Sequence, residues 1–181
     1  MSDNVQKQTT ESITFRIPSN SINLLREEAK KKQISLNTLL NQVIREHLDW
    51  HTFAAPAGLF YIPRSTMSLV LSKLTEEEIS ELAIIIAKRD IDIGLLLKGE
   101  FTLSSFLNIL ENWSRISSFA YKHEVTNEVH NFIIQHDMGS NYSFFVKEII
   151  QYIFQEMFKV KLDSTITENT VVFRFSGSSE R

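Results

Sequence analysis

The chain has 181 residues and a net charge of −3, and hydrophobic residues make up 43% of it. With only five Gly and three Pro, this composition is typical of a folded, mostly helical protein and excludes a linker-rich one. The sequence contains no cysteine, which excludes disulfides, thiolate metal sites and thiol nucleophiles. We see no secretion signal, and the longest apolar run, Leu82–Ala87, is too short to span a membrane, so we expect a cytoplasmic protein without a membrane partner.

Residues 1–11 are polar and are expected to form a flexible arm, and the first patterned element follows at Ser12–Ile17. This segment alternates polar and apolar residues, which predicts a strand. The two faces carry Ser12, Thr14 and Arg16 on one side, and Ile13, Phe15 and Ile17 on the other. A lone strand is not stable in water, and no second strand lies near in sequence, so the simplest partner is the same strand of a second chain. Two such strands form an antiparallel ribbon, which fits the major groove of B-DNA.

Two amphipathic helices are predicted after Pro18, separated by a polar turn at Lys30–Ser35. Ser19 is the expected N-cap of the first helix, which should run to Lys32. Ser35 is the expected N-cap of the second helix, which has a broad apolar stripe. The free N–H groups and the helix dipole at its first turn suit a phosphate oxygen.

This order of strand, proline, helix, polar turn and helix resembles the ribbon-helix-helix family of DNA-binding proteins over residues 12–50. The resemblance implies that three alternate strand side chains contact base edges. Here these are Ser12, Thr14 and Arg16. It also implies phosphate contacts at the start of the second helix, and Lys32 is a further candidate for such a contact. The implied phosphate-binding residues are Ser35, Leu36 and Asn37. The alternative is an ordinary helical hairpin with its N-terminal strand docked on the rest of the protein.

The charge is divided unevenly along the chain. Residues 1–50 hold seven Lys and Arg against six Asp and Glu, a net of +1, and the remainder holds twelve against sixteen, a net of −4. The acidic excess therefore lies outside the proposed DNA-binding module. A net of +1 predicts modest non-specific affinity, so binding would depend on local placement of charge and on dimerisation.

After a predicted linker at 51–58, a second unit is expected over residues 59–176, with a flexible tail at 177–181. Its first half is predicted as helices: one around Met67–Leu74, one from a capping box of Thr75 and Glu78 to about Lys88, a buried one at Asp90–Lys98, and one capped by Thr102. Its second half is predicted as strands near Phe119–His123 and at Val129–Gln135, a long helix ending at Phe158, and strands at Val160–Leu162 and Thr170–Phe175. The fold class is therefore α+β, with a ribbon-helix-helix module and a helix-rich domain ending in ββ-α-ββ.

The polar set of most interest in this unit is the pair His123 and His130. If the hairpin turn is centred on Thr126-Asn127, the two residues are directly opposed, with Cβ atoms about 5 Å apart. Two imidazoles so placed could share a transition metal or titrate together near neutral pH. The alternative is a solvated pair on the open face of a sheet. No other cofactor is indicated.

We find no enzyme signature in the sequence, neither a glycine-rich phosphate loop nor a Gly-x-Ser-x-Gly or His-Glu-x-x-His motif, and we expect no catalytic activity. The leading hypothesis is a homodimeric, sequence-specific transcriptional regulator that binds double-stranded DNA. Its C-terminal domain would add dimerisation or sense a signal through a small-molecule or protein partner. The alternatives are an antitoxin-type protein whose C-terminal domain binds a partner protein, and a metal- or ligand-responsive regulator. The helical aromatic residues are expected in the core, or around a lipophilic ligand pocket: Phe144, Phe145, Phe154 and Phe158.

Overall fold

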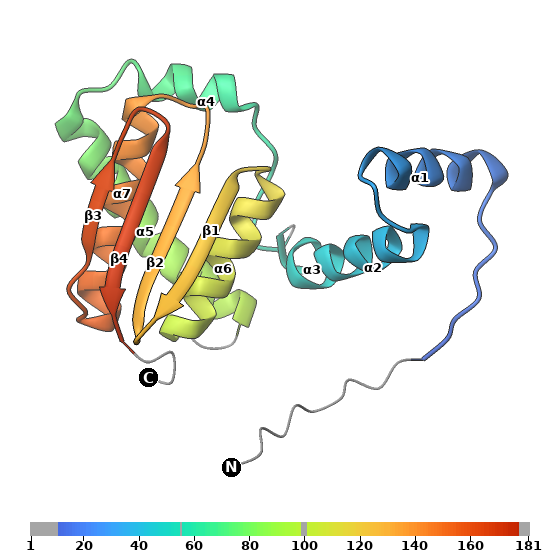
Figure 1. The fold of residues 1–181 in the computed structure, drawn as a ribbon. Coiled ribbons are helices and arrows are strands. Elements are labelled where there is room, and N and C mark those ends of the chain that lie inside the picture. The colour runs from blue at the N-terminus through green and yellow to red at the C-terminus, as the bar shows by residue number, and fades with distance from the viewer. Residues whose placement is uncertain (1–10, 55, 99–100, 178–181) are drawn as a thin grey trace, which may run out of the picture. The chain divides into compact units, whose positions relative to one another are not determined.

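Two units, residues 1–45 and 46–181, make up the chain in the computed structural model (Figure 1). The structure describes residues 11–54, 56–98 and 101–177. The predicted flexible arm and flexible tail therefore lie almost wholly outside the described residues. The fold is mixed α+β, as predicted, with its sheet near the C-terminus.

The first unit holds a pair of helices, α1 (Ser19–Lys31) and α2 (Leu36–Glu46). The predicted N-cap of α2 is confirmed, because the backbone N–H of Thr38 donates to Oγ of Ser35 over 3.0 Å. The predicted cap of α1 is wrong. Ser19 is already helical, and the residue in the N-cap position is Pro18, whose side chain has no acceptor for a cap bond. Its φ of −54° leads the chain directly into the helix.

The end of α1 is closed by a Schellman motif. The N–H of Ile34 donates to the carbonyl of Ala29 over 3.0 Å, and the N–H of Gln33 donates to that of Lys30 over 3.1 Å. Gln33 takes the left-handed conformation that this motif requires, with φ of 55°. The predicted polar turn therefore forms without a glycine.

The segment Ser12–Ile17 is not a strand in the single chain, and its predicted pairing with the same segment of a second chain stays a prediction. Residues 11–18 are extended and have no regular secondary structure. Strand hydrogen bonds need a neighbouring edge, and the described part of the first unit contains no other strand to provide one. The ribbon-helix-helix module is therefore not formed by one chain alone.

Helical backbone continues beyond α2 through a π-helical turn, η1 (His47–His51), to α3 (Thr52–Ala54). It includes the first residues of the predicted linker at 51–58. Gly58 then adopts a left-handed conformation with φ of 74°, and the N–H of Leu59 donates back to the carbonyl of Ala54 over 2.8 Å. The chain has no regular secondary structure from there to Pro63, and the next helix begins at Arg64.

The second unit is a four-stranded antiparallel sheet with helices packed on one face (Figure 1). The strands are β1 (Ala120–Thr126), β2 (Val129–Gln135), β3 (Asp163–Ile166) and β4 (Thr170–Ser176), in the order β1-β2-β4-β3. The helices are α4 (Arg64–Leu71), α5 (Glu76–Lys98), α6 (Leu103–Ile116) and α7 (Ser140–Ile153), which is extended by η2 (Phe154–Phe158). Between β1 and β4 the chain runs ββ-α-ββ, as predicted.

Alternate residues of the central strands form the core beneath the helices. The fully buried ones on β2 and β4 include Phe132, Ile134, Val171 and Phe173. The period-2 pattern of these strands places their apolar side chains on the face covered by α6 and α7, and α5 packs on α7. The other face of the sheet carries partly exposed residues.

Helix starts were predicted well in this unit. The backbone N–H of Thr75 donates to Glu78 over 2.8 Å and the reciprocal bond is 3.2 Å, so the predicted capping box is confirmed. Thr102 caps α6, as predicted, in a second capping box with Ser105. The predicted break near residues 88–90 is wrong, because α5 is a single helix and no glycine or proline interrupts it there.

The first strand of the last pair is also displaced from its prediction. Lys159, in a left-handed conformation with φ of 54°, ends the helical run, and residues 160–162 connect it to β3. The strand forms at Asp163–Ile166 instead, because pairing of Ile166 with Val171 follows from the short turn between β3 and β4.

Candidate functional site

The three predicted base-contacting residues lie in the extended N-terminal segment of the first unit. Ser12, Thr14 and Arg16 are all exposed, and they alternate with Ile13, Phe15 and Ile17. In a strand, alternate side chains lie on opposite sides, so the division of this segment into a polar and an apolar face stays a prediction.

The apolar side chains of this segment are not covered by the described residues of their own unit. Phe15 is 58% exposed and Ile13 72% exposed. Val43 and Ile44 on α2 are exposed as well, whereas only Ala29 and Leu39 are buried among the described residues of the first unit. A unit with two buried apolar side chains has too little core to be stable by itself. Exposed apolar surface of this kind is typical of a surface that packs against another part of a protein or another chain.

The predicted phosphate site lies at the start of α2. Ser35 and Asn37 are exposed and Leu36 is partly exposed. The first turn of a helix leaves backbone N–H groups without intrahelical partners, and Ser35 satisfies that of Thr38. Lys32 lies just before this turn, with its ammonium 2.7 Å from Oε1 of Glu28 in an exposed ion pair.

The histidine pair is arranged differently from the prediction. His123 is paired with Phe132, and His130 with Val125, so the two histidines are not directly opposed. The reason is the position of the turn, which is centred on Asn127-Glu128 rather than on Thr126-Asn127. Both Asn127 and Glu128 have positive φ, 50° and 62°, as a two-residue type I′ turn requires.

The two histidines nevertheless meet, as diagonal neighbours on the core face of the sheet. Their ring centroids are 5.2 Å apart, and Nε2 of His123 lies 2.9 Å from Nδ1 of His130. Glu111 of α6 lies 2.9 Å from Nδ1 of His123, and the carbonyl of Gly177 lies 3.1 Å from Nε2 of His130. His130 is buried, so the alternative of a solvated pair on the open face is wrong.

The carbonyl of Gly177 can only accept, which determines one proton position in this chain of groups when the His130 ring is neutral. His130 donates its Nε2–H to Gly177, so its Nδ1 accepts a proton from Nε2 of His123. Nδ1 of His123 faces the Glu111 carboxylate, and a further proton must lie between those two groups. Burial, followed by the neighbouring His123, lowers the pKa of His130 below its usual range, against the opposing effect of the Gly177 bond. A metal shared by the two rings would have to replace these hydrogen bonds, and the described residues contain no group of three or more His, Cys, Asp or Glu arranged to hold one.

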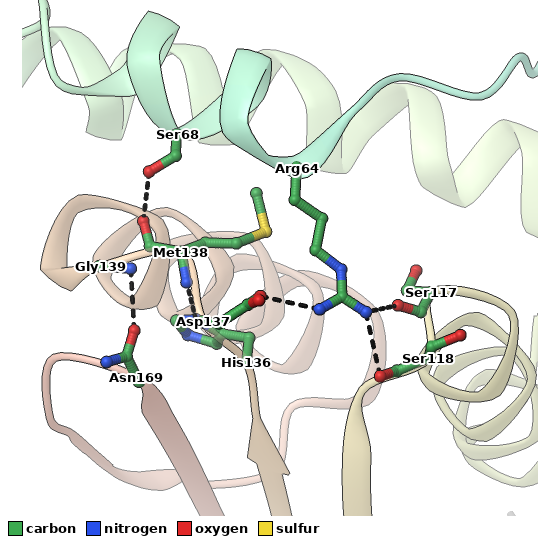
Figure 2. A network of polar contacts seen from close by, with 9 residues as sticks. All are labelled: Arg64, Ser68, Ser117, Ser118, His136, Asp137, Met138, Gly139 and Asn169. Carbon is green, nitrogen blue, oxygen red and sulfur yellow. Dashed lines mark hydrogen bonds and ion pairs between the residues drawn. The ribbon is translucent and has the colours of Figure 1, made fainter.

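A second polar network, which no sequence pattern indicated, is centred on Arg64 (Figure 2). Its guanidinium donates to Asp137 over 2.8 Å and to the carbonyls of Ser117 and Ser118, and it lies over the ring of Phe119 at 4.8 Å. The hydrogen bond from Arg64 lowers the pKa of the Asp137 carboxyl. The network joins the start of α4 to the loops before β1 and α7. These segments are far apart in sequence, so no local spacing could have predicted it.

His136 is buried in the same region, between β2 and α7. Its Nδ1 accepts from the N–H of Met138 over 3.2 Å, and its Nε2 lies 2.9 Å from Oγ of Ser143 (the Met138 bond is drawn in Figure 2). The first bond requires an unprotonated Nδ1, so the ring is neutral with its proton on Nε2. Burial accordingly lowers the pKa of His136. This histidine holds the turn before α7.

The second unit also contains a cavity of about 580 Å³. Its walls are formed mainly by α5, α6 and α7, with Trp50, Ala54 and the segment at 59–62 on another side. Sequence patterns suggested a lipophilic pocket near four phenylalanines, and one of these, Phe145, lines the cavity. Asp90 of α5 also lines it, and no sequence pattern had singled out this residue.

Comparison with known proteins assigns no family to the chain. No protein-family model matches its sequence, and no match is found among curated proteins. Within the described residues, no helix is both long enough and apolar enough to cross a membrane. The resemblance of residues 12–50 to ribbon-helix-helix proteins therefore rests on their own pattern.

Proposed function

We propose that the protein is a homodimeric, sequence-specific DNA-binding regulator of transcription. The segments Ser12–Ile17 of two chains pair as an antiparallel ribbon, and this ribbon enters the major groove. The observation that supports this most directly is the exposed alternating row Ile13, Phe15 and Ile17 on a unit that buries little else. Burying one such side chain stabilises a structure by roughly 1.5–3 kcal/mol, and dimerisation would bury three from each chain.

Pairing two extended segments solves two problems of the single chain at once. It satisfies the open backbone N–H and C=O groups of residues 12–17, and it encloses the apolar face between the helices of both chains. The polar face is then presented twice, related by two-fold symmetry. A two-fold symmetric ribbon recognises a palindromic site.

The residues of the polar face have the chemistry that base recognition needs. Arg16 offers a forked donor that matches O6 and N7 of guanine, and the hydroxyls of Ser12 and Thr14 can donate or accept. The first turn of α2, at Ser35–Asn37, would hold a backbone phosphate and set the orientation of the ribbon. Lys32 would contribute a phosphate contact by exchanging its exposed Glu28 partner, at small cost.

Two substitutions on adjacent residues test the roles of the two faces of the segment separately. Phe15→Asp introduces an unpaired charge into the dimer core, so we expect a monomer in sedimentation equilibrium and loss of duplex binding. Thr14→Asp introduces the same charge on the opposite face. We expect it to remain dimeric and to lose duplex binding, because its carboxylate faces the bases and phosphates.

Both variants are measured in the full chain, on a duplex that the wild-type protein selects from a random pool. A wild-type protein that is monomeric would contradict the ribbon. So would a Phe15→Asp variant that still dimerises through residues 12–17, or a Thr14→Asp variant that binds the duplex as tightly as wild type.

A further inference from the structure

The cavity of the second unit has the size and the lining of a small-molecule site. Its volume of about 580 Å³ lies within the range of roughly 300–1,000 Å³ that is usual for ligand pockets. Six aromatic side chains from α6, α7 and nearby loops are part of its wall: Phe101, Phe106, Trp113, Phe119, Tyr142 and Phe145. Aromatic faces carry partial negative charge and attract cations.

The charged side chains of the cavity wall differ in whether they have hydrogen-bond or ion-pair partners. Among the described residues that line the cavity, only Arg64 and Asp90 carry a formal charge. Arg64 is neutralised by Asp137 at 2.8 Å, and its second terminal nitrogen donates to two backbone carbonyls. Asp90 has no hydrogen bond or ion pair within the described part of the chain. The uncompensated charge of the cavity is therefore negative.

The apolar surroundings of Asp90 disfavour the ionised form of its carboxyl group. Burial raises its pKa to about 6, and the neighbouring Arg89 offsets only part of this effect. An acidic group in an apolar wall without a partner lowers the stability of the free protein, and a cation in the cavity would relieve that penalty.

We propose that this cavity binds a lipophilic organic cation, with Asp90 as its counter-ion and the aromatic wall around its apolar groups. The proposal goes beyond the proposed DNA-binding function and does not depend on it. The chemical class follows from the wall itself: an apolar, aromatic interior selects a hydrophobic molecule, and the one unpaired carboxylate selects a positive charge.

The experiment uses two probes of the same shape and opposite charge, tetraphenylphosphonium and tetraphenylborate, with the full-length protein. Both tryptophans of the chain, Trp50 and Trp113, line the cavity, so their fluorescence reports occupancy, and calorimetry gives the affinity. We expect saturable binding of the cation at one site per chain, at least tenfold tighter than binding of the anion.

Asp90→Asn should weaken cation binding at least tenfold and abolish the preference for the cation over the anion. The matched control is Asp92→Asn, which removes the same charge from an exposed position of the same helix and should leave the affinity unchanged. Equal affinity for both probes, no saturable binding of the cation, or the same loss in both variants would overturn the proposal.

The thermal stability of the Asp90→Asn variant is a control for folding, because the raised pKa of Asp90 determines whether the variant should melt above or below wild type. The pKa of Asp90 is raised from 3.8 to about 6, so between these values the folded state holds a proton that the unfolded state has lost. Ionised Asp90 therefore destabilises the free protein above pH 6. The variant should melt above wild type at pH 7–8, and the difference should shrink as the pH falls below 6. A variant that melts well below wild type at pH 7–8 would show that Asp90 stabilises the fold and would contradict its role as an unpaired counter-ion.

Discussion

At the scale of single residues, two fully buried serines of the second unit differ in what their hydroxyls contact. Ser143 lies 2.9 Å from Nε2 of His136 and donates to the carbonyl of Glu168 over 3.2 Å. Oγ of Ser114 on α6 has no hydrogen-bond partner. Among the buried side-chain nitrogen and oxygen atoms that the structure describes, it is the only one without a partner. The burial of the two side chains is the same, so their substitution isolates the effect of the hydrogen bonds.

We predict that Ser143→Ala lowers the free energy of unfolding by about 1–3 kcal/mol, because it leaves the buried Nε2–H of His136 without an acceptor. Ser114→Ala should leave the stability unchanged or raise it, since it removes a buried hydroxyl that has no partner. Urea unfolding followed by circular dichroism measures both. Equal losses in the two variants would show that side-chain packing, and not the His136 hydrogen bond, determines the result.

At the scale of elements, capping signals predicted three helix starts correctly, whereas the cap predicted at Ser19 was wrong. The side chains of Ser35, Thr75 and Thr102 all cap their helices, because a cap is a contact between residues three apart. The register of the β1–β2 pair was harder to predict than the helix starts. The β1–β2 turn lacks an Asn-Gly pair, so its centre could be placed at either of two positions, and the wrong choice displaced the pairing of His123.

The same turn gives a prediction. Glu128 has φ of 62° in the second position of the turn, where glycine is preferred because it has no Cβ to clash with the backbone. Glu128→Gly should stabilise the protein by roughly 0.5–1 kcal/mol, less than the full strain because glycine also gains freedom when unfolded. Asn127→Gly is the control and should gain less, since asparagine tolerates this conformation. Thermal melting that ranks the two variants in the opposite order would contradict the type I′ assignment.

At the scale of the whole molecule, the parts that resisted prediction are those that depend on distant residues or on a second chain. Arg64 and Asp137 are 73 positions apart, and nothing in their local sequence relates them. The ββ-α-ββ order was predictable from periodicity, whereas the chain of Glu111, His123 and His130 depended on how α6 packs on the sheet. The predicted strand at residues 12–17 needs a partner edge, and the described part of its own unit contains no other strand.

The central claim, that two paired N-terminal segments recognise DNA, is tested most directly by selecting duplexes from a random pool with the purified full-length chain. We predict enrichment of a short palindromic sequence by the wild type. Arg16→Ala should relax one symmetric pair of positions in that sequence and lose about 1–3 kcal/mol of specific binding, whereas Arg26→Ala, an equal charge change on the exposed side of α1, should retain the sequence preference. A selection that enriches no sequence, or a preference that Arg16→Ala leaves intact, would contradict the claim.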